Sequence, residues 1–459
     1  MQSSFLLYRR VLALAFLLLP CFISVAQAAV GQPLAASQWQ RPVAVYAFAL
    51  YFSKAQGAAP DKLARELAAS APYGFQVVAT LDAGVKPVQS VMLKTFAGNV
   101  AADYAPPTVA SLKYFGRGLT LAQAENLQKT PQVLVLVFKV PTRDALPGLR
   151  KANALAHRLA TETDALLWDE ETREMFSPAA WKSLRLDTWE DQLPDVSRHI
   201  TIHAYNDDDK VRAISLGMGK FALPDLVVND MVWSLSNPLS NTINTVAQTL
   251  VQGARPSGSG VLEVQVAAIR HGALRSKIES AVANGGTGRG QVVLQQAAPQ
   301  DGDPDNTLLE LRFGGAAGDD TTTRQTAFVK RLFGAQEDKV VMRKRNDAAL
   351  LAASERAKKK LPALRAAFQA GLQPGEIVML KAPFATAQEG VEWMWVEVSQ
   401  WSGEKITGML RNEPRYVPSL KAGQMVEIKQ SDVFDYIRRR ADGQQEGNET
   451  SEILSKAPQ

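Results

Sequence analysis

Strand-like and helix-like segments alternate irregularly along this 459-residue chain, and this irregularity limits its fold class more than any other feature. Apolar runs rich in Val and aromatic residues, such as residues 42–52 and 131–140, are typical of buried strands. Residues 59–70 instead show the spacing of an amphipathic helix, with a proline near its start. Because the two kinds of segment do not alternate regularly, we expect residues 41–253 to form one α+β region.

A stretch rich in Gly, Ser and Pro at residues 253–260 separates this region from a more regular one. Beyond it, the order strand, helix, strand, strand, helix, strand over residues 261–345 predicts a ferredoxin-like βαββαβ middle domain. Residues 346–370 are predicted to form a connecting helix, and residues 371–453 a small β-rich domain. The chain is therefore expected to be a multidomain α+β protein.

Residues 1–28 show the features of a secretory signal peptide. Arg9 and Arg10 precede an apolar run that ends in an Ala-Gln-Ala triplet. The run has roughly 15 residues where a membrane span needs about 20, and Pro20 interrupts it. We therefore expect cleavage after Ala28, a periplasmic or secreted protein, and no transmembrane segment in the mature chain.

Cleavage at that position would remove Cys21, the only cysteine of the sequence. The mature chain would then have no disulfide, no cysteine nucleophile and no thiolate metal site. The formal net charge is only +5. The main basic cluster, residues 356–360, ends a predicted helix, where cations complement the helix dipole. We therefore expect no nucleic-acid partner, because such a partner would require clustered positive charge on one face.

His199 and His203 are the candidates for a metal site. They are four residues apart in a predicted strand, so their side chains would share one face, and the acidic turn 207–209 follows them. Two histidines and a carboxylate would suit a metal-dependent hydrolase in the N-terminal region, which is the alternative hypothesis. However, residues four apart on a strand are about 13 Å from each other, too far to bind one ion directly. We therefore predict no metal and no cofactor.

Two further stretches resemble ligand-binding loops without meeting their requirements. Residues 301–306 carry Asp at alternate positions, as calcium loops do, but Asn306 and Arg312 replace the required Gly and Glu. Residues 285–290 are rich in glycine but precede a strand, whereas a phosphate cradle precedes a helix. No recognised catalytic motif is present, and the sequence favours a non-catalytic protein.

Three tryptophans lie close together in the segment from 391 to 414: Trp393, Trp395 and Trp401. Trp393 and Trp395 fall on one face of a predicted strand, and the other face is also mostly apolar, which predicts burial on both sides. We expect at least one tryptophan to be a core residue, because three would fill much of a small core. Four residues at the strand ends and the following turn are the candidates for binding an unknown protein or small ligand of the cell envelope: Trp393, Trp401, Arg411 and Asn412.

Five sequence blocks of the C-terminal part follow one another in a characteristic order: "EWMWVEV", "ITGMLRNEP", "LKAGQMVEI", "SDVFDYI" and "DGQQEGNET". In them this part of the chain resembles the bacterial domain of unknown function 2314, the YegJ-like family. The pattern falls on Trp395, Gly408, Leu410, Asn412, Pro414, Gly423, Val426, Asp435, Tyr436, Asp442, Gly443, Gly447 and Thr450. Only Tyr436 departs from it, since Trp is more usual there. The resemblance implies a compact β-rich module and brings no established activity, substrate or cofactor.

The same residues can be interpreted physically. Gly408 and Gly423 suit tight turns or positive φ, and Asn412 with Pro414 suits a turn. The Asp-Gly pair at 442–443 is typical of a hairpin. The motif therefore specifies a fold before it specifies a reaction. We expect an exported binding or interaction module; a structural envelope protein that only bridges partners is a further hypothesis.

Overall fold

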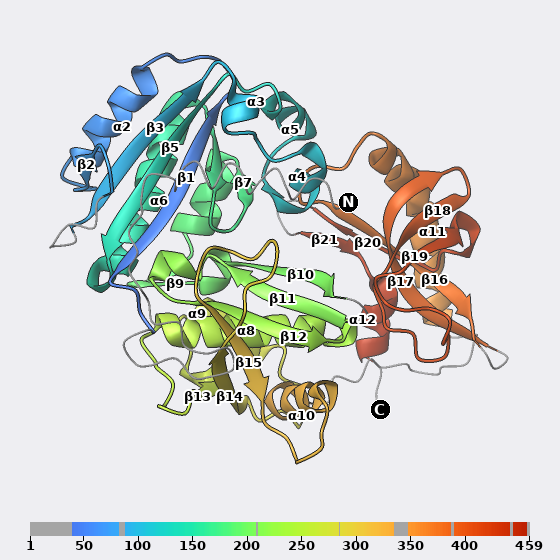
Figure 1. Cartoon of the computed structure of the whole chain (residues 1–459). Coiled ribbons are helices and arrows are strands. Elements are labelled where there is room, and N and C mark those ends of the chain that lie inside the picture. Colours follow the sequence, from blue (N-terminus) through green and yellow to red (C-terminus); the bar gives the residue numbers. More distant parts are fainter. Residues whose placement is uncertain are drawn as a thin grey trace. The chain divides into compact units, whose positions relative to one another are not determined.

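The computed structural model describes residues 39–81, 88–207, 210–283, 285–334, 348–386, 390–440 and 444–456 (Figure 1). Its elements form two compact units. The first unit takes the described residues up to Val109 and those from Gln123 to Gly334. The second takes Ala110–Ala122 and the described residues from 348 onward. Mixed helices and strands in both units confirm the α+β class.

The first sheet of the first unit is centred on β1, whose sequence is almost continuously apolar. Its strands lie in the order β2 (Gln76–Val78), β3 (Ser90–Ala97), β5 (Gln132–Pro141), β1 (Val43–Phe52), β6 (Leu166–Asp169) and β7 (Glu174–Phe176). β1 pairs antiparallel with both β5 and β6. Helices α2 (Ala59–Ala69) and α6 (Ala145–Thr163) pack against each other and against the sheet (Figure 1). The central strands are apolar on both faces because both faces are buried.

The second sheet of this unit joins strands from both sides of the Gly- and Ser-rich stretch. Its order is β10 (Thr201–Asp207), β11 (Lys210–Leu216), β12 (Asp225–Met231), β15 (Leu308–Phe313), β14 (Arg289–Gln296) and β13 (Val261–Gln265). Neighbours are antiparallel except β12 and β15, which are parallel. Helices α8 (Ser236–Val251) and α10 (Thr321–Phe333) pack together on the sheet, and α9 (Gly272–Glu279) follows β13.

The ferredoxin-like domain predicted over 261–345 is not confirmed. The expected elements β13, α9, β14, β15 and α10 are present, and the last predicted strand lies outside the described residues. In the split βαβ arrangement the first strand lies beside the third. Here β13 pairs with β14, β14 with β15, and β15 then pairs with β12. These strands therefore extend a sheet begun earlier in the chain.

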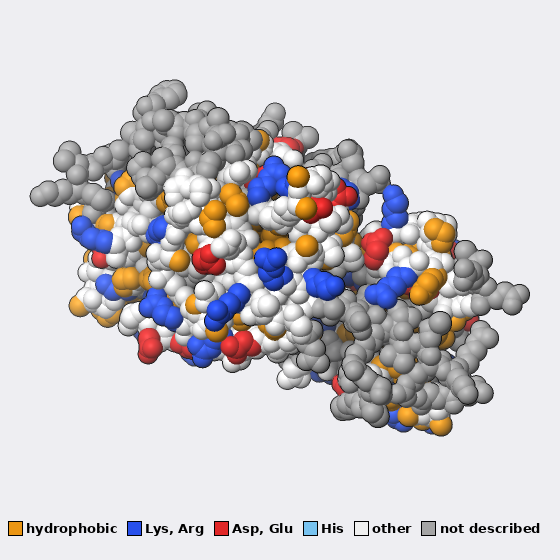
Figure 2. Space-filling model, turned by 90° about the horizontal axis from the view of Figure 1, so that it is seen from below, with side chains coloured by type: hydrophobic (Ala, Val, Ile, Leu, Met, Phe, Trp, Pro, Cys, Tyr) orange, Lys and Arg blue, Asp and Glu red, His pale blue; other side chains and the backbone are white. Residues whose placement is uncertain are grey.

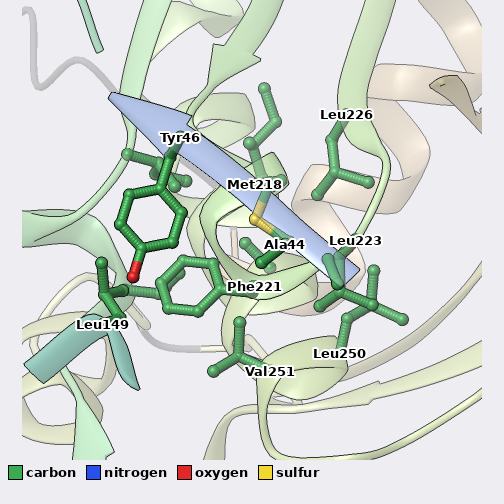
Figure 3. Packing of buried hydrophobic residues seen from close by; sticks show 14 of the residues in the cluster. Ala44, Tyr46, Leu149, Met218, Phe221, Leu223, Leu226, Leu250 and Val251 are labelled. Carbon is green, nitrogen blue, oxygen red and sulfur yellow. The ribbon is translucent and has the colours of Figure 1, made fainter. Parts of the chain in front are cut away.

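One hydrophobic core joins the two sheets of the first unit (Figure 3). Tyr46 of β1 and Leu149 of α6 lie beside Phe221 of the short helix η5 (Met218–Phe221). Leu226 of β12 and Leu250 of α8 belong to the same buried cluster. Continuous burial across both sheets explains why they form one compact unit.

Short elements complete the first unit. They are η2 (Thr142–Asp144), α3 (Val100–Asp103), α7 (Pro178–Trp181), η3 (Lys182–Leu186), β8 (Trp189–Glu190), β9 (Leu193–Pro194), η4 (Val196–Arg198), η6 (Trp233–Leu235) and η7 (Val266–Ala268). Helix α5 (Leu121–Leu127) spans the second boundary between the units. Within the part of the chain that the structure describes, no helix combines the length and apolarity needed to cross a membrane.

The second unit is a sheet with a long helix on one face. The strand order is β19 (Met425–Lys429), β18 (Lys405–Leu410), β17 (Val391–Ser402), β16 (Ile377–Ala385), β20 (Asp435–Arg439) and β21 (Gln445–Gly447). All neighbours are antiparallel. Helix α11 (Ala348–Gln369) occupies the position of the predicted connecting helix, and its apolar side chains pack on the sheet. The helices η8 (Gln430–Asp432) and α12 (Glu449–Lys456) complete the unit.

Residues 110–122 contribute to the second unit although they are distant from it in sequence. They hold most of α4 (Val109–Phe115) and the short strand β4 (Gly116–Arg117). The Gly375 N–H donates to the Lys113 carbonyl at 2.8 Å, and the Leu121 N–H donates to Gln373 Oε1 at 2.8 Å. These bonds tie the segment to the turn between α11 and β16.

Candidate functional site

The start of strand β17 is exposed on the face of the sheet that α11 does not cover. Its inward side chains Met394, Val396 and Val398 are buried in the cluster that includes α11. The alternate side chains point to the opposite face, where Val391 is 36% and Trp393 is 40% exposed. The sequence predicts burial on both faces, but α11 covers only one of them, so this part of the prediction is wrong near the start of the strand.

Trp393 does not stand alone on this face. Its ring packs against that of Phe434, with centroids 4.5 Å apart and planes inclined by 39°. The Phe434 N–H donates to the Lys381 carbonyl at 2.8 Å, which fixes this residue beside the sheet. We call Val391, Trp393 and Phe434 the aromatic surface. It presents contiguous apolar side chains to solvent.

Lys381 lies next to the aromatic surface, opposite Trp395 in the pairing of β16 with β17. Its ammonium group is 5.5 Å from the centroid of the Trp395 ring and donates to Thr450 Oγ1 at 3.5 Å, a long bond. Burial lowers the pKa of Lys381, while the Asp435 carboxylate acts in the opposite direction. Because burial has the larger effect on this pKa, the negative charge nearby does not fully offset the cost of burying the ammonium; we call the ammonium incompletely compensated.

Both carboxylate oxygens of Asp435 accept hydrogen bonds from groups other than Lys381. Oδ1 accepts from the Tyr436 N–H at 2.8 Å. Oδ2 accepts from the Thr450 N–H at 2.9 Å and from Thr450 Oγ1 at 2.6 Å, which holds the first turn of α12. Among the described residues, no carboxylate forms an ion pair with Lys381.

Trp401 lies in the core of the second unit. It is 5% exposed and packs near Phe368 of α11, with ring centroids 6.2 Å apart. Its indole Nε1–H donates to Gln430 Oε1 at 3.1 Å. The strand reaches Trp401 after a bulge between Val398 and Gln400, which returns the side chain to the α11 face.

Arg411 and Asn412, the other predicted binding residues, hold the turn after β18 against β17. Asn412 Oδ1 accepts from the Trp395 N–H at 2.5 Å, and the Arg411 N–H donates to the Trp395 carbonyl at 2.8 Å. The Arg411 Nε atom is 3.7 Å from a carboxylate oxygen of the buried Glu397. Of the four predicted residues, the structure thus places only Trp393 on an exposed apolar surface.

The glycines of the C-terminal motif have structural roles. Gly408 lies inside β18, where a Cβ would approach the Glu397 carbonyl oxygen to 2.2 Å, so close strand approach and not a turn requires glycine there. Gly423 has φ +83°, as predicted from its type. At Gly447, with φ +88°, a Cβ would lie 2.1 Å from the Tyr436 carbonyl oxygen. The predicted hairpin at 442–443 lies outside the described residues.

The first unit contains a buried charge cluster that sequence reasoning missed: Asp169, Glu174, Arg185 and Lys220. Lys220 Nζ is 2.6 Å from Asp169 Oδ2, and Arg185 Nη2 is 3.2 Å from the same oxygen. Arg185 also pairs with Glu174 at 2.9 Å. The only sequence features that could have indicated this cluster are the closely spaced acidic residues within 169–174 and Lys220, a lysine between apolar stretches.

Three carboxyl groups around this cluster retain protons unusually well. Burial raises the pKa of Glu170 to about 7 and that of Glu171 to about 8, and the neighbouring Asp169 and Asp225 carboxylates add to the rise at Glu171. Burial raises the pKa of Asp225 to about 6, against hydrogen bonds from Asn306 and Ser215. Shifted acids are common at catalytic sites, but the charged members here are enclosed, which favours a structural role.

The histidine pair of the hydrolase hypothesis is not arranged as a metal site. His199 is completely buried, with its ring centroid 5.5 Å from Trp189 and 6.3 Å from Phe221. Burial, followed by the Arg185 and Lys220 charges, holds its pKa well below the ordinary value. It precedes β10, whereas His203 lies within it. Among the described residues, which exclude Asp208 and Asp209, no group of three or more metal-binding side chains gathers.

Comparison with known proteins identifies the C-terminal part only. Residues 347–456 match the family described as "Uncharacterized protein conserved in bacteria (DUF2314)". The match confirms the resemblance seen in the five sequence blocks and its restriction to the C-terminal part. It includes α11, so the family region contains both the sheet and the helix that covers it. No curated protein and no solved structure matches the chain.

Proposed function

We propose that this protein, whose C-terminal region belongs to that bacterial family, is an exported, non-catalytic binding protein that contacts its partner through the aromatic surface. One observation carries the proposal: Trp393 is 40% exposed, its ring packs at a tilt against Phe434, and the exposed Val391 lies two positions before it in the same strand. Isolated apolar side chains on a surface are ordinary, whereas a contiguous set anchored by tryptophan is typical of an interaction site.

The rest of the second unit supports a recognition role for this surface. The motif residues around it, such as Asn412 and Asp435, are engaged in backbone hydrogen bonds. They hold the strands and α12 in place and do not form an acid and base pair. A rigid sheet bearing one exposed tryptophan suits binding better than catalysis, because little ordering would accompany association.

Export is the second part of the proposal. It rests on the sequence of residues 1–28, which lie outside the described part of the chain. A periplasmic or secreted location would make the partner a protein or small ligand of the cell envelope. Figure 2 shows, on one face, Lys and Arg side chains lying among acidic and uncharged ones, and the low net charge of +5 favours such a partner over nucleic acid.

Photo-crosslinking in the producing bacterium tests the binding role. A p-benzoylphenylalanine replaces Val391, and the matched control carries it at Tyr416, which is 51% exposed in the same unit. We expect a discrete crosslinked product from position 391 and none from position 416. Adding Trp393→Ala to the Val391 variant should reduce the product by about tenfold or more, as for an interface anchor.

The same experiment can contradict the proposal. Equal products from positions 391 and 416, or a product unaffected by Trp393→Ala, would show that the aromatic surface does not select a partner. The far-ultraviolet circular dichroism of the Trp393→Ala variant should match that of the wild type, which separates lost binding from lost folding.

A further inference from the structure

The incompletely compensated ammonium of Lys381 specifies what kind of partner the aromatic surface can accept. Among the described residues its polar contacts are the long bond to Thr450 and the face of Trp395. An apolar partner placed over this area would bury the ammonium further without pairing it, which is unfavourable. A carboxylate on the partner would instead supply the missing charge.

The register of the strands sets the distance between the cation and the exposed ring. Lys381 is opposite Trp395, and Pro383 is opposite Trp393. Positions two apart along a strand share a face and are about 7 Å from each other. The pair Lys381 and Trp395 and the pair Pro383 and Trp393 therefore form two neighbouring cross-strand rows on the same face of the sheet.

We propose that Lys381 and Trp393 together bind an extended peptide segment of an envelope protein, in which an apolar residue and an Asp or Glu are two positions apart. The inference rests on the proposed binding function and adds the chemistry of the partner. Side chains two apart in an extended peptide also lie on one face about 7 Å from each other. The apolar side chain packs on Trp393 and Phe434, and the carboxylate pairs with Lys381.

An open surface fits a polypeptide better than a small molecule. The neighbouring side chains Val391 and Trp393 are both more than one-third exposed. Small ligands usually require a concavity that buries most of their surface, whereas an extended peptide can lie across a sheet. On this face of β16 and β17, the exposed Trp393 and the half-buried Lys381 offer the two rows of contacts that such a segment needs.

Blocked heptapeptides test this inference on the full-length protein. The probe is Gly-Ser-Phe-Ser-Asp-Ser-Gly, acetylated and amidated, with an Asn-for-Asp counterpart and the spacing control Gly-Phe-Ser-Ser-Asp-Ser-Gly. Binding is followed by the indole N–H signals of Trp393 and Trp395 in ¹H–¹⁵N spectra. We expect the Asp peptide to bind at least about tenfold more tightly than either control.

Protein variants assign that preference to Lys381. Lys381→Met should abolish the difference between the Asp and Asn peptides. The control Lys405→Met should preserve it, because Lys405 is an exposed lysine already paired with Glu427 at 2.6 Å. Equal discrimination by wild type and Lys381→Met would overturn the inference.

The outcomes also separate this inference from the binding function beneath it. If crosslinking from position 391 depends on Trp393 but the Asp peptide binds no better than the Asn peptide, the surface binds a partner of another chemistry and the inference is wrong. If neither crosslinking nor peptide binding depends on Trp393, the proposed function itself fails.

Discussion

At the scale of single residues, Trp393 and Trp401 show how similar sequence positions acquire different roles. Both lie in the same strand, and the sequence makes both candidates for binding. Trp401 is turned into the core by the bulge after Val398, whereas Trp393 keeps its place on the free face. The sequence could not assign the faces, because the position of α11 and the bulge decide them.

This difference leads to a stability prediction. Trp401→Ala should lower the free energy of unfolding of the second unit by about 3–5 kcal/mol, because it leaves a cavity and removes the hydrogen bond to Gln430. Trp393→Ala should lower it by only about 1 kcal/mol, since its ring is partly exposed. Native-state hydrogen exchange of β17 and β18 measures both changes. Equal losses for the two variants would contradict the assigned roles.

The residues of the C-terminal motif were partly predictable. Gly423 has the positive φ that its residue type suggests, and Asn412 bonds to the backbone near its turn. Gly408 was expected in a tight turn or at positive φ, but it lies in a strand whose partner approaches too closely for any side chain. Such an approach depends on a residue distant in sequence, so a single stretch of sequence does not reveal it.

At the scale of elements, periodicity predicted where the strands of the second sheet lie in the sequence, but it did not predict which strands pair. β13, β14 and β15 occur where the pattern predicts them. β15 pairs with β12, which packs against α8 and α10, while β15 itself packs against α10; the local sequence pattern does not report these contacts. The buried charge cluster escaped prediction for the same reason, because its members come from separate elements.

Protonation near this cluster should make the stability of the first unit depend on pH. Burial raises the pKa of Glu171 from 4.5 to about 8, so the native chain holds a proton that the unfolded chain releases. Its stabilising effect is complete below about pH 4.5 and is lost as pH rises to about 8. We expect the free energy of unfolding to fall by at most about 1 kcal/mol between pH 7 and 8.

Glu171→Gln should remove most of that decline, and the exposed control Glu66→Gln should leave it unchanged. Hydrogen exchange of β6 and β12 between pH 7 and 8, corrected for the intrinsic exchange rate, provides the measurement. Glu170, whose pKa is raised to about 7, acts in the same direction but is already half deprotonated at pH 7, so Glu171 causes the larger part of the decline in this window. An undiminished decline in Glu171→Gln would refute this assignment.

At the scale of the whole molecule, neither compact unit is one continuous stretch of the chain. Residues 253–260 suggest a boundary, yet the hydrophobic core of the first unit includes side chains from both sides of them, such as Leu250 and Leu262. Residues 110–122 belong instead with the C-terminal unit. Composition detects flexible stretches, but it does not detect apolar surfaces that meet across them.

The central claim is that the mature, exported protein binds a partner through Trp393. Native mass spectrometry of protein recovered from the periplasm tests it most directly, using the wild type, Trp393→Ala and Tyr416→Ala. We predict a chain that begins at Ala29 and carries a stoichiometric polypeptide partner in the wild type and in Tyr416→Ala, with the partner lost in Trp393→Ala. An uncleaved chain retained in the cytoplasm, or a partner retained equally by all three proteins, would contradict the claim.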